Sequence, residues 1–142
     1  MADDSQRPAR ADLAVSVTVS GDPALVDAVR AVAARIGEFA GCPAGEAATL
    51  GQAVGHAVSG VAQSTPAGDP QRLVDIEFES NGRLLSVDMS CRGDEAGGFP
   101  LEETLAASGD DVAMRGLVDR VEFARTAGRQ VCRLTRQVRA TR

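Results

Sequence analysis

The alternation of apolar and polar residues is clearest near the start of the chain. Between residues 13 and 20, Leu and Val occupy every second position, and Ala, Ser and Thr lie between them. A period of two is typical of a β-strand that turns one face towards a core. Gly21 follows this run, so we expect the strand to end there.

Two helices are predicted next. Asp22 can accept from free backbone N–H groups of a first turn, and Pro23 needs no donor there, so this pair marks a helix start. Apolar residues then recur at helical spacing until Gly41 ends the helix. A second helix is predicted over residues 44–63, with a buried stripe of Ala47, Leu50, Val54, Ala57, Val58 and Val61.

The second half of the chain predicts two hairpins. After a loop of turn-forming residues, segments 73–79 and 84–91 alternate again around the turn dipeptide Asn81-Gly82. A long acidic connection is expected to lead to a short helix over 112–118. The closing hairpin is predicted from residues 120–125 and 130–139.

This order of elements predicts an α+β fold, a two-layer sandwich with helices on one face of a mixed or antiparallel sheet. We expect one domain over residues 12–139. Residues 1–11 are polar, mixed in charge and contain Pro8, which indicates a flexible N-terminal tail.

Charge and composition exclude several classes of function. The net charge of −5 argues against general binding of nucleic acid, which needs a clustered positive surface. No window has the apolar length of a membrane span, and the N-terminus lacks the apolar region of a secretory signal, so we expect a soluble cytoplasmic protein. The three scattered cysteines indicate single buried thiols rather than a disulfide framework or a metal site.

Residues 117–138, LVDRVEFARTAGRQVCRLTRQV, are similar to the closing helix and hairpin of the anti-sigma-factor serine kinases, a bacterial branch of the GHKL (histidine-kinase-like, Bergerat-fold) ATPases. Residues 52–62 resemble the N-box helix of that family, and residues 94–99 resemble its adenine-binding loop. The resemblance implies a partner-switching regulator that binds a sigma factor, a STAS-domain antagonist, or both. Members are commonly dimers, and the residues of this chain neither support nor exclude a homodimer.

In that family the N-box helix carries a glutamate and, four residues later, an asparagine, which face the same pocket. The glutamate activates the attacking hydroxyl and the asparagine holds Mg²⁺. The resemblance places His56 and Gly60 at these positions. Glycine has no oxygen ligand to offer, so bound Mg²⁺ is not expected. His56 is the candidate catalytic base; the alternatives are an exposed polar helix face and a phosphoacceptor histidine.

The candidate adenine loop keeps more of the family's outline. The resemblance assigns Asp94 to the adenine amino group, with Gly97 and Gly98 forming the turn beside it. ATP is therefore the candidate cofactor, and the alternative is a charged loop that contains two glycines by chance. In active members a second glycine-rich segment wraps the phosphates with its backbone. Here that segment is reduced to Gly109 followed by two aspartates, whose negative charge would repel phosphates. We interpret the two aspartates as a helix cap.

The C-terminal segment is rich in arginine. Six arginines and no acidic residue occur between residues 125 and 142. Alternate residues of a strand point the same way, so Arg129, Arg133 and Arg139 are candidates for a ladder that docks an acidic partner. A solvated strand that protects the sheet edge is the alternative.

Three functions are consistent with these observations. The first is a regulatory protein of the anti-sigma factor type whose ATP binding and kinase activity are weakened or lost. The second is an active, divergent serine kinase that phosphorylates its STAS antagonist. The third is an unrelated α+β interaction domain. The absence of the N-box glutamate and asparagine favours the first, and whether the chain is an enzyme stays open.

Overall fold

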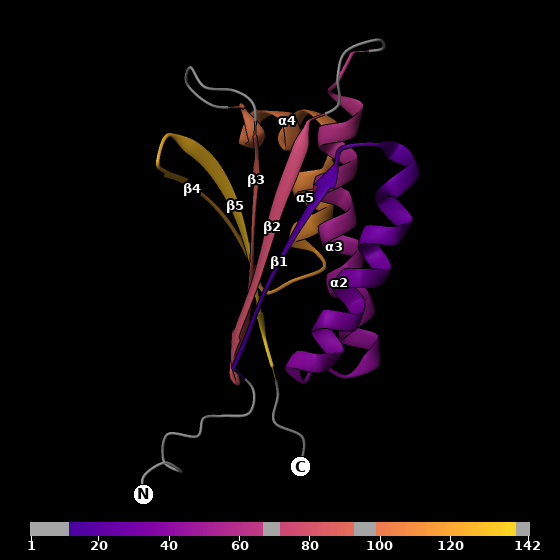
Figure 1. Ribbon diagram of the computed structural model, residues 1–142, viewed down its shortest axis with the longest axis vertical. Coiled ribbons are helices and arrows are strands. Elements are labelled where there is room, and N and C mark those ends of the chain that lie inside the picture. Colours follow the sequence, from indigo (N-terminus) through magenta and orange to yellow (C-terminus); the bar gives the residue numbers. More distant parts are fainter. Residues whose placement is uncertain (1–11, 67–71, 93–98, 139–142) are drawn as a thin grey trace, which may run out of the picture.

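The computed structural model describes residues 12–66, 72–92 and 99–138. These residues form one antiparallel sheet of five strands, with the helices packed against one of its faces (Figure 1). The predicted α+β two-layer class is therefore confirmed, and the sheet is antiparallel rather than mixed. The tail predicted for residues 1–11 lies outside the described residues.

The sheet has the strand order β1-β2-β3-β5-β4, so β1 and β4 are its two edges. Residues that alternate along each strand meet in rows across the sheet. Apolar side chains therefore lie on the face that carries the helices, and polar side chains lie on the opposite face. One apolar row consists of Val15, Phe78, Val87, Leu134 and Val121. The strand bounds are β1 (Asp12–Ser20), β2 (Leu73–Asn81), β3 (Leu84–Cys91), β4 (Arg120–Thr126) and β5 (Arg129–Gln137).

The helical layer begins as the sequence predicts. Asp22 Oδ1 accepts from the Ala24 backbone N–H at 2.9 Å and caps the 3₁₀ helix η1 (Pro23–Leu25), which leads into α2 (Val26–Ala40). Helix α3 (Ala44–Gln63) has the predicted bounds and lies between α2 and the sheet, so that most of its residues are buried (Figure 1). Gly51 lets the two helices approach, because a Cβ there would meet the Arg30 carbonyl oxygen at 2.5 Å.

The connection after β3 differs from the prediction. Its second half is helical, and forms α4 (Leu101–Ser108) and α5 (Asp110–Arg115), so the helix predicted over 112–118 is wrong in its bounds. Each helix is too short to show a clear apolar period, but Leu105 and Met114 are fully buried and anchor them to the core. Gly109, with φ of 84°, makes the turn between them.

No helix in the described ranges is both long and apolar enough to cross a membrane. The face of the sheet opposite the helices, which we call the open face, carries serines, threonines and charged residues from every strand. The hydrophobic core therefore lies in a single layer between the sheet and the helices.

The three cysteines are free and buried, as predicted. Burial raises the pKa of the Cys91 thiol and of the Cys132 thiol to about 12, and it raises the pKa of Cys42 as well. Because the thiolate is the reactive form, we expect an aromatic disulfide reagent near pH 8 to leave Cys91 and Cys132 unmodified in the folded protein. The control is the chain in concentrated urea, where every thiol should react; fast modification of both thiols without urea would contradict the packing.

Candidate functional site

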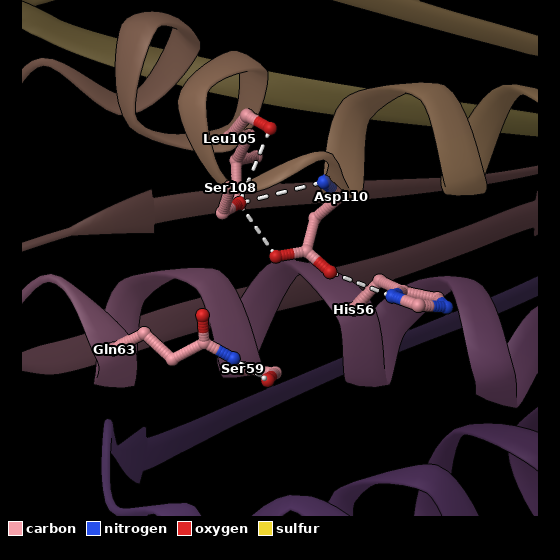
Figure 2. Close-up of polar contacts among 6 residues, drawn as sticks. All are labelled: His56, Ser59, Gln63, Leu105, Ser108 and Asp110. Atoms are coloured by element: carbon pink, nitrogen blue, oxygen red, sulfur yellow. Dashed lines mark hydrogen bonds and ion pairs between the residues drawn. The ribbon is translucent and has the colours of Figure 1, made fainter.

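The candidate site lies where α3 meets the junction of α4 and α5, and it centres on the carboxylate of Asp110 (Figure 2). His56 Nδ1 is 2.7 Å from Asp110 Oδ1, and the Ser108 hydroxyl donates to Asp110 Oδ2 at 2.6 Å. An ionised carboxylate only accepts, so beside an ionised Asp110 the Nδ1–H of His56 would be the donor in this contact. The site thus joins one residue of α3 to two residues of the α4–α5 turn.

The turn at Gly109 creates this convergence. Its left-handed backbone reverses the chain, so that Ser108 ends one helix and Asp110 begins the next with both side chains directed at the same point. Asp110 is only 8% exposed. Burial of a carboxylate is costly without hydrogen bonds, and here both of its oxygens have a partner.

Gly60 lies against the same junction, one turn of α3 after His56. A Cβ at this position would be 2.5 Å from Leu105 Cδ2 and 2.9 Å from Asp110 Oδ2. Real Cβ atoms do not approach other atoms so closely, so α4 and α5 occupy the space that a side chain at position 60 would need. A side chain at position 60 would therefore require the side chains of Leu105 and Asp110 to shift.

These contacts change the interpretation of the α3 polar stripe. Gly60 is buried, and the His56 side chain is one third exposed and bonded to Asp110, so the stripe is not simply an exposed face. Further along α3, Gln63 donates to the Ser59 hydroxyl at 3.1 Å (Figure 2). The structure thus holds His56 by its Nδ1 atom, which is compatible with its prediction as a base.

The prediction that the two aspartates after Gly109 cap a helix is wrong. Helix α5 has no side-chain cap bond, Asp110 reaches across to α3, and Asp111 pairs with Arg115 at 2.9 Å. Sequence reasoning also missed Ser108. The available signal was one histidine on α3 and a serine and aspartate flanking a glycine, but only the fold shows that they meet.

The candidate adenine residues Asp94, Gly97 and Gly98 lie outside the described residues. Phe99 follows directly and is buried, and the Arg72 guanidinium carbon lies 4.6 Å from the centre of its ring. Within the described ranges, no group of three or more His, Cys, Asp or Glu side chains is placed to hold a metal ion.

The predicted arginine ladder is neutralised by the neighbouring strands. Arg133 binds Asp88 through two bonds of 2.7 and 2.8 Å, and Arg129 donates to Ser90 at 2.9 Å and lies 3.5 Å from Asp75. Burial alone would raise the pKa of Asp75, but hydrogen bonds from Arg92 and Thr18 outweigh it, so its pKa is lowered. Arg129 and Arg133 are therefore paired with acidic residues of the open face, while Arg139 lies outside the described residues.

Comparisons with known proteins identify the fold. No protein-family model matches the chain, and no curated protein matches it. Among solved structures, the chain is similar to the RsbU and RsbW domains of Rv1364c from Mycobacterium tuberculosis, with a TM-score of 0.60 and 17% sequence identity. The match covers 92% of this chain and 34% of that one, so this chain spans about a third of the length of its neighbour. The shared feature is the α+β architecture of an antiparallel sheet with helices on one face.

An asparagine at position 60, the residue found there in the family that the sequence resembles, tests the packing. We expect Gly60→Asn to lower the free energy of unfolding by about 1–3 kcal/mol, because Leu105 and the Asp110 carboxylate must move. Urea unfolding followed by circular dichroism measures the change. The matched control is Gly45→Asn in the first turn of the same helix, where a Cβ meets nothing within 4 Å. An asparagine tolerated equally at both positions would show that α4 and α5 do not pack against Gly60.

Proposed function

We propose that this chain is a regulatory protein of the anti-sigma factor type, which binds a sigma factor, a STAS-domain antagonist, or both, with its ATP binding and kinase activity weakened or lost. The fold likeness to a structure that contains an RsbW domain supports the class of protein. The observation that carries the loss of activity is the close packing of Leu105 and Asp110 against Gly60.

The chemistry at Gly60 opposes a magnesium-bound triphosphate. Mg²⁺ requires oxygen ligands in near-octahedral geometry, and glycine supplies none. The nearest carboxylate, Asp110, already binds His56 and Ser108. An additional anion beside this buried carboxylate would meet like charge where a phosphate site needs N–H donors or cations. The described residues therefore do not fit a Mg²⁺–ATP complex at this position.

The divergent serine kinase is a second candidate, and the contact between His56 and Asp110 favours it. A carboxylate that holds Nδ1–H of a histidine leaves the other ring nitrogen free to accept a proton, which is the arrangement of an oriented general base. In such an enzyme His56 would take the proton of the substrate serine. Transfer of labelled phosphate to a STAS-domain protein, abolished in His56→Ala, would favour this candidate over the first.

ATP titration by isothermal calorimetry separates the two candidates. We expect no micromolar binding that depends on Mg²⁺, because position 60 offers no ligand and the adjacent space is filled. The titration is run with Mg²⁺ and with a chelator, and the control is an active anti-sigma kinase measured in the same buffers. Micromolar affinity that rises with Mg²⁺ would overturn the proposed loss of nucleotide binding.

Partner binding tests the regulatory part of the proposal. We expect affinity purification from the source cell to recover a sigma factor or a STAS-domain protein, and the purified pair to form a complex of defined stoichiometry without ATP. Light scattering after gel filtration measures that complex. If no sigma factor or STAS-domain protein binds the purified chain, the proposed regulatory function is contradicted, while the fold assignment stands.

A further inference from the structure

The two edges of the sheet differ in how they are protected. Unpaired backbone groups on an edge strand can recruit another strand, and proteins discourage this with charged residues, prolines or bulges. The β4 edge carries Arg120, Glu122 and Arg125. The β1 edge has no charged residue, proline or glycine between Leu13 and Ser20. Among the described strands, β1 therefore presents an edge that is open to pairing with an extended segment.

An apolar strip runs beside this edge on the side of the helices. The Leu and Val residues of β1 on that side are only half-buried. Leu25, Val32 and Phe39 follow one another at a spacing of seven, which places them on one side of the η1–α2 segment, and all three are exposed. A cavity of about 80 Å³ lies between the strand and the helix, with a wholly apolar lining of Val17, Val19, Leu25, Ala28, Val29, Val32, Ile76 and Phe78.

Two carboxylates without a partner lie on the open face, one strand in from the same edge. Glu77 and Glu79 of β2 are exposed, and neither makes a hydrogen bond or an ion pair within the described part of the chain. The neighbouring aspartates of β2 and β3 are held by arginines. The register places Ser16 beside Glu77 and Ala14 beside Glu79. Only small side chains therefore separate these two carboxylates from the edge.

We propose that β1 is a docking edge for an extended segment of a partner protein, in which aliphatic residues alternate with arginine or lysine. The segment adds a sixth strand to the five-stranded sheet and pairs with the backbone of β1. Its aliphatic side chains cover the apolar strip, and its basic side chains lie on the open face. Strands are about 4.8 Å apart, so the added strand lies about 10 Å from β2, which an arginine and a glutamate side chain span together. Its cations thus reach Glu77 and Glu79 across Ala14 and Ser16.

The charges select this partner over the other occupants of the edge. A second copy of the chain would present β1 itself, which has no basic residue between positions 13 and 20 and would leave Glu77 and Glu79 unmatched. Residues 1–11 contain two arginines but lack alternating valine or leucine. A segment that alternates aliphatic and basic residues matches the backbone, the apolar strip and the carboxylates at the same time.

The probe for this edge is the synthetic peptide Thr-Val-Arg-Val-Arg-Val-Thr, acetylated and amidated at its ends. Its sequence reads the same in both directions, so the test does not depend on whether the added strand is parallel or antiparallel. We expect saturable binding by fluorescence anisotropy, and slower hydrogen exchange at alternate amides of β1 but not of β4. The control is Val-Val-Val-Thr-Arg-Arg-Thr, which has the same composition and charge without the alternation.

Three results of this titration would overturn the proposal. The first is a peptide that stays unbound at about 1 mM. The second is binding that leaves the exchange of the β1 amides unchanged, and the third is equal affinity for the control peptide. Light scattering reports the remaining occupant: a chain that dimerises through β1 and does not release its copy to the peptide would assign the edge to self-pairing and refute a docking role.

The carboxylates have their own test. We expect Glu77→Gln combined with Glu79→Gln to weaken binding of the basic peptide about fivefold, because two exposed ion pairs are lost. The charge-matched control is Glu102→Gln combined with Glu103→Gln, which changes two exposed glutamates of α4 and should leave the affinity unchanged. Replacing Glu77 and Glu79 by lysine should reverse the preference in favour of Thr-Val-Glu-Val-Glu-Val-Thr. An unchanged preference would contradict the role of these carboxylates, and circular dichroism checks that each variant folds.

The apolar strip is tested by Val32→Gln, which removes apolar surface without adding charge. We expect it to weaken binding of the basic peptide at least about threefold. The matched control is Val112→Gln on α5, where an exposed valine lies outside the strip. Equal affinity in both variants would show that the peptide does not lie on the strip.

This inference does not rest on the proposed function. The measurements use the purified chain and synthetic peptides, without nucleotide, sigma factor or STAS protein, so their failure would leave the regulatory proposal as it stands.

Discussion

The docking of α5 onto α3 through the Asp110 carboxylate is the contact on which the site depends. It brings a negative charge to 8% exposure in the helical layer, and the hydrogen bonds of His56 and Ser108 compensate the cost of that burial. The same contact fixes the position of α4, because Ser108 ends that helix and Leu105 packs against Gly60. A small polar cluster thereby sets the shape of the region that the resemblance assigns to nucleotide.

The parts of the fold that the sequence predicts correctly are those in which a regular spacing of apolar residues continues over a whole element. Helix α3 and the faces of β2 follow from repeated apolar spacing, and the sequence predicts both correctly. Helix α4 was missed and α5 was predicted with the wrong bounds, because a helix of two turns shows too little period and acidic residues with a glycine are also typical of loops. Their burial at Leu105 and Met114 is a tertiary effect that local pattern does not contain.

The site was predictable only in its individual residues. His56 stood out as the chain's one histidine on a helix face, and Gly60 stood out through the family resemblance. Asp110 is 54 positions from His56, and no periodicity links them. The same limit applies to the open face, where the sequence predicts a basic ladder but the strand register places Asp75 and Asp88 beside the arginines. The neutralisation of arginines by aspartates on neighbouring strands depends on the strand register, which cannot be predicted from the sequence of one strand.

The two differences between α3 and the N-box helix that it resembles share one physical constraint. A glutamate at position 56 would place its carboxylate against that of Asp110, in contact distance and largely shielded from water, where two like charges repel strongly. A histidine there donates a hydrogen bond instead. An asparagine at position 60 would collide with Leu105 and the same Asp110 carboxylate, and glycine leaves room for both. With α5 docked onto α3, a glutamate at position 56 and an asparagine at position 60 would both be unfavourable, so a single contact accounts for both differences from the N-box.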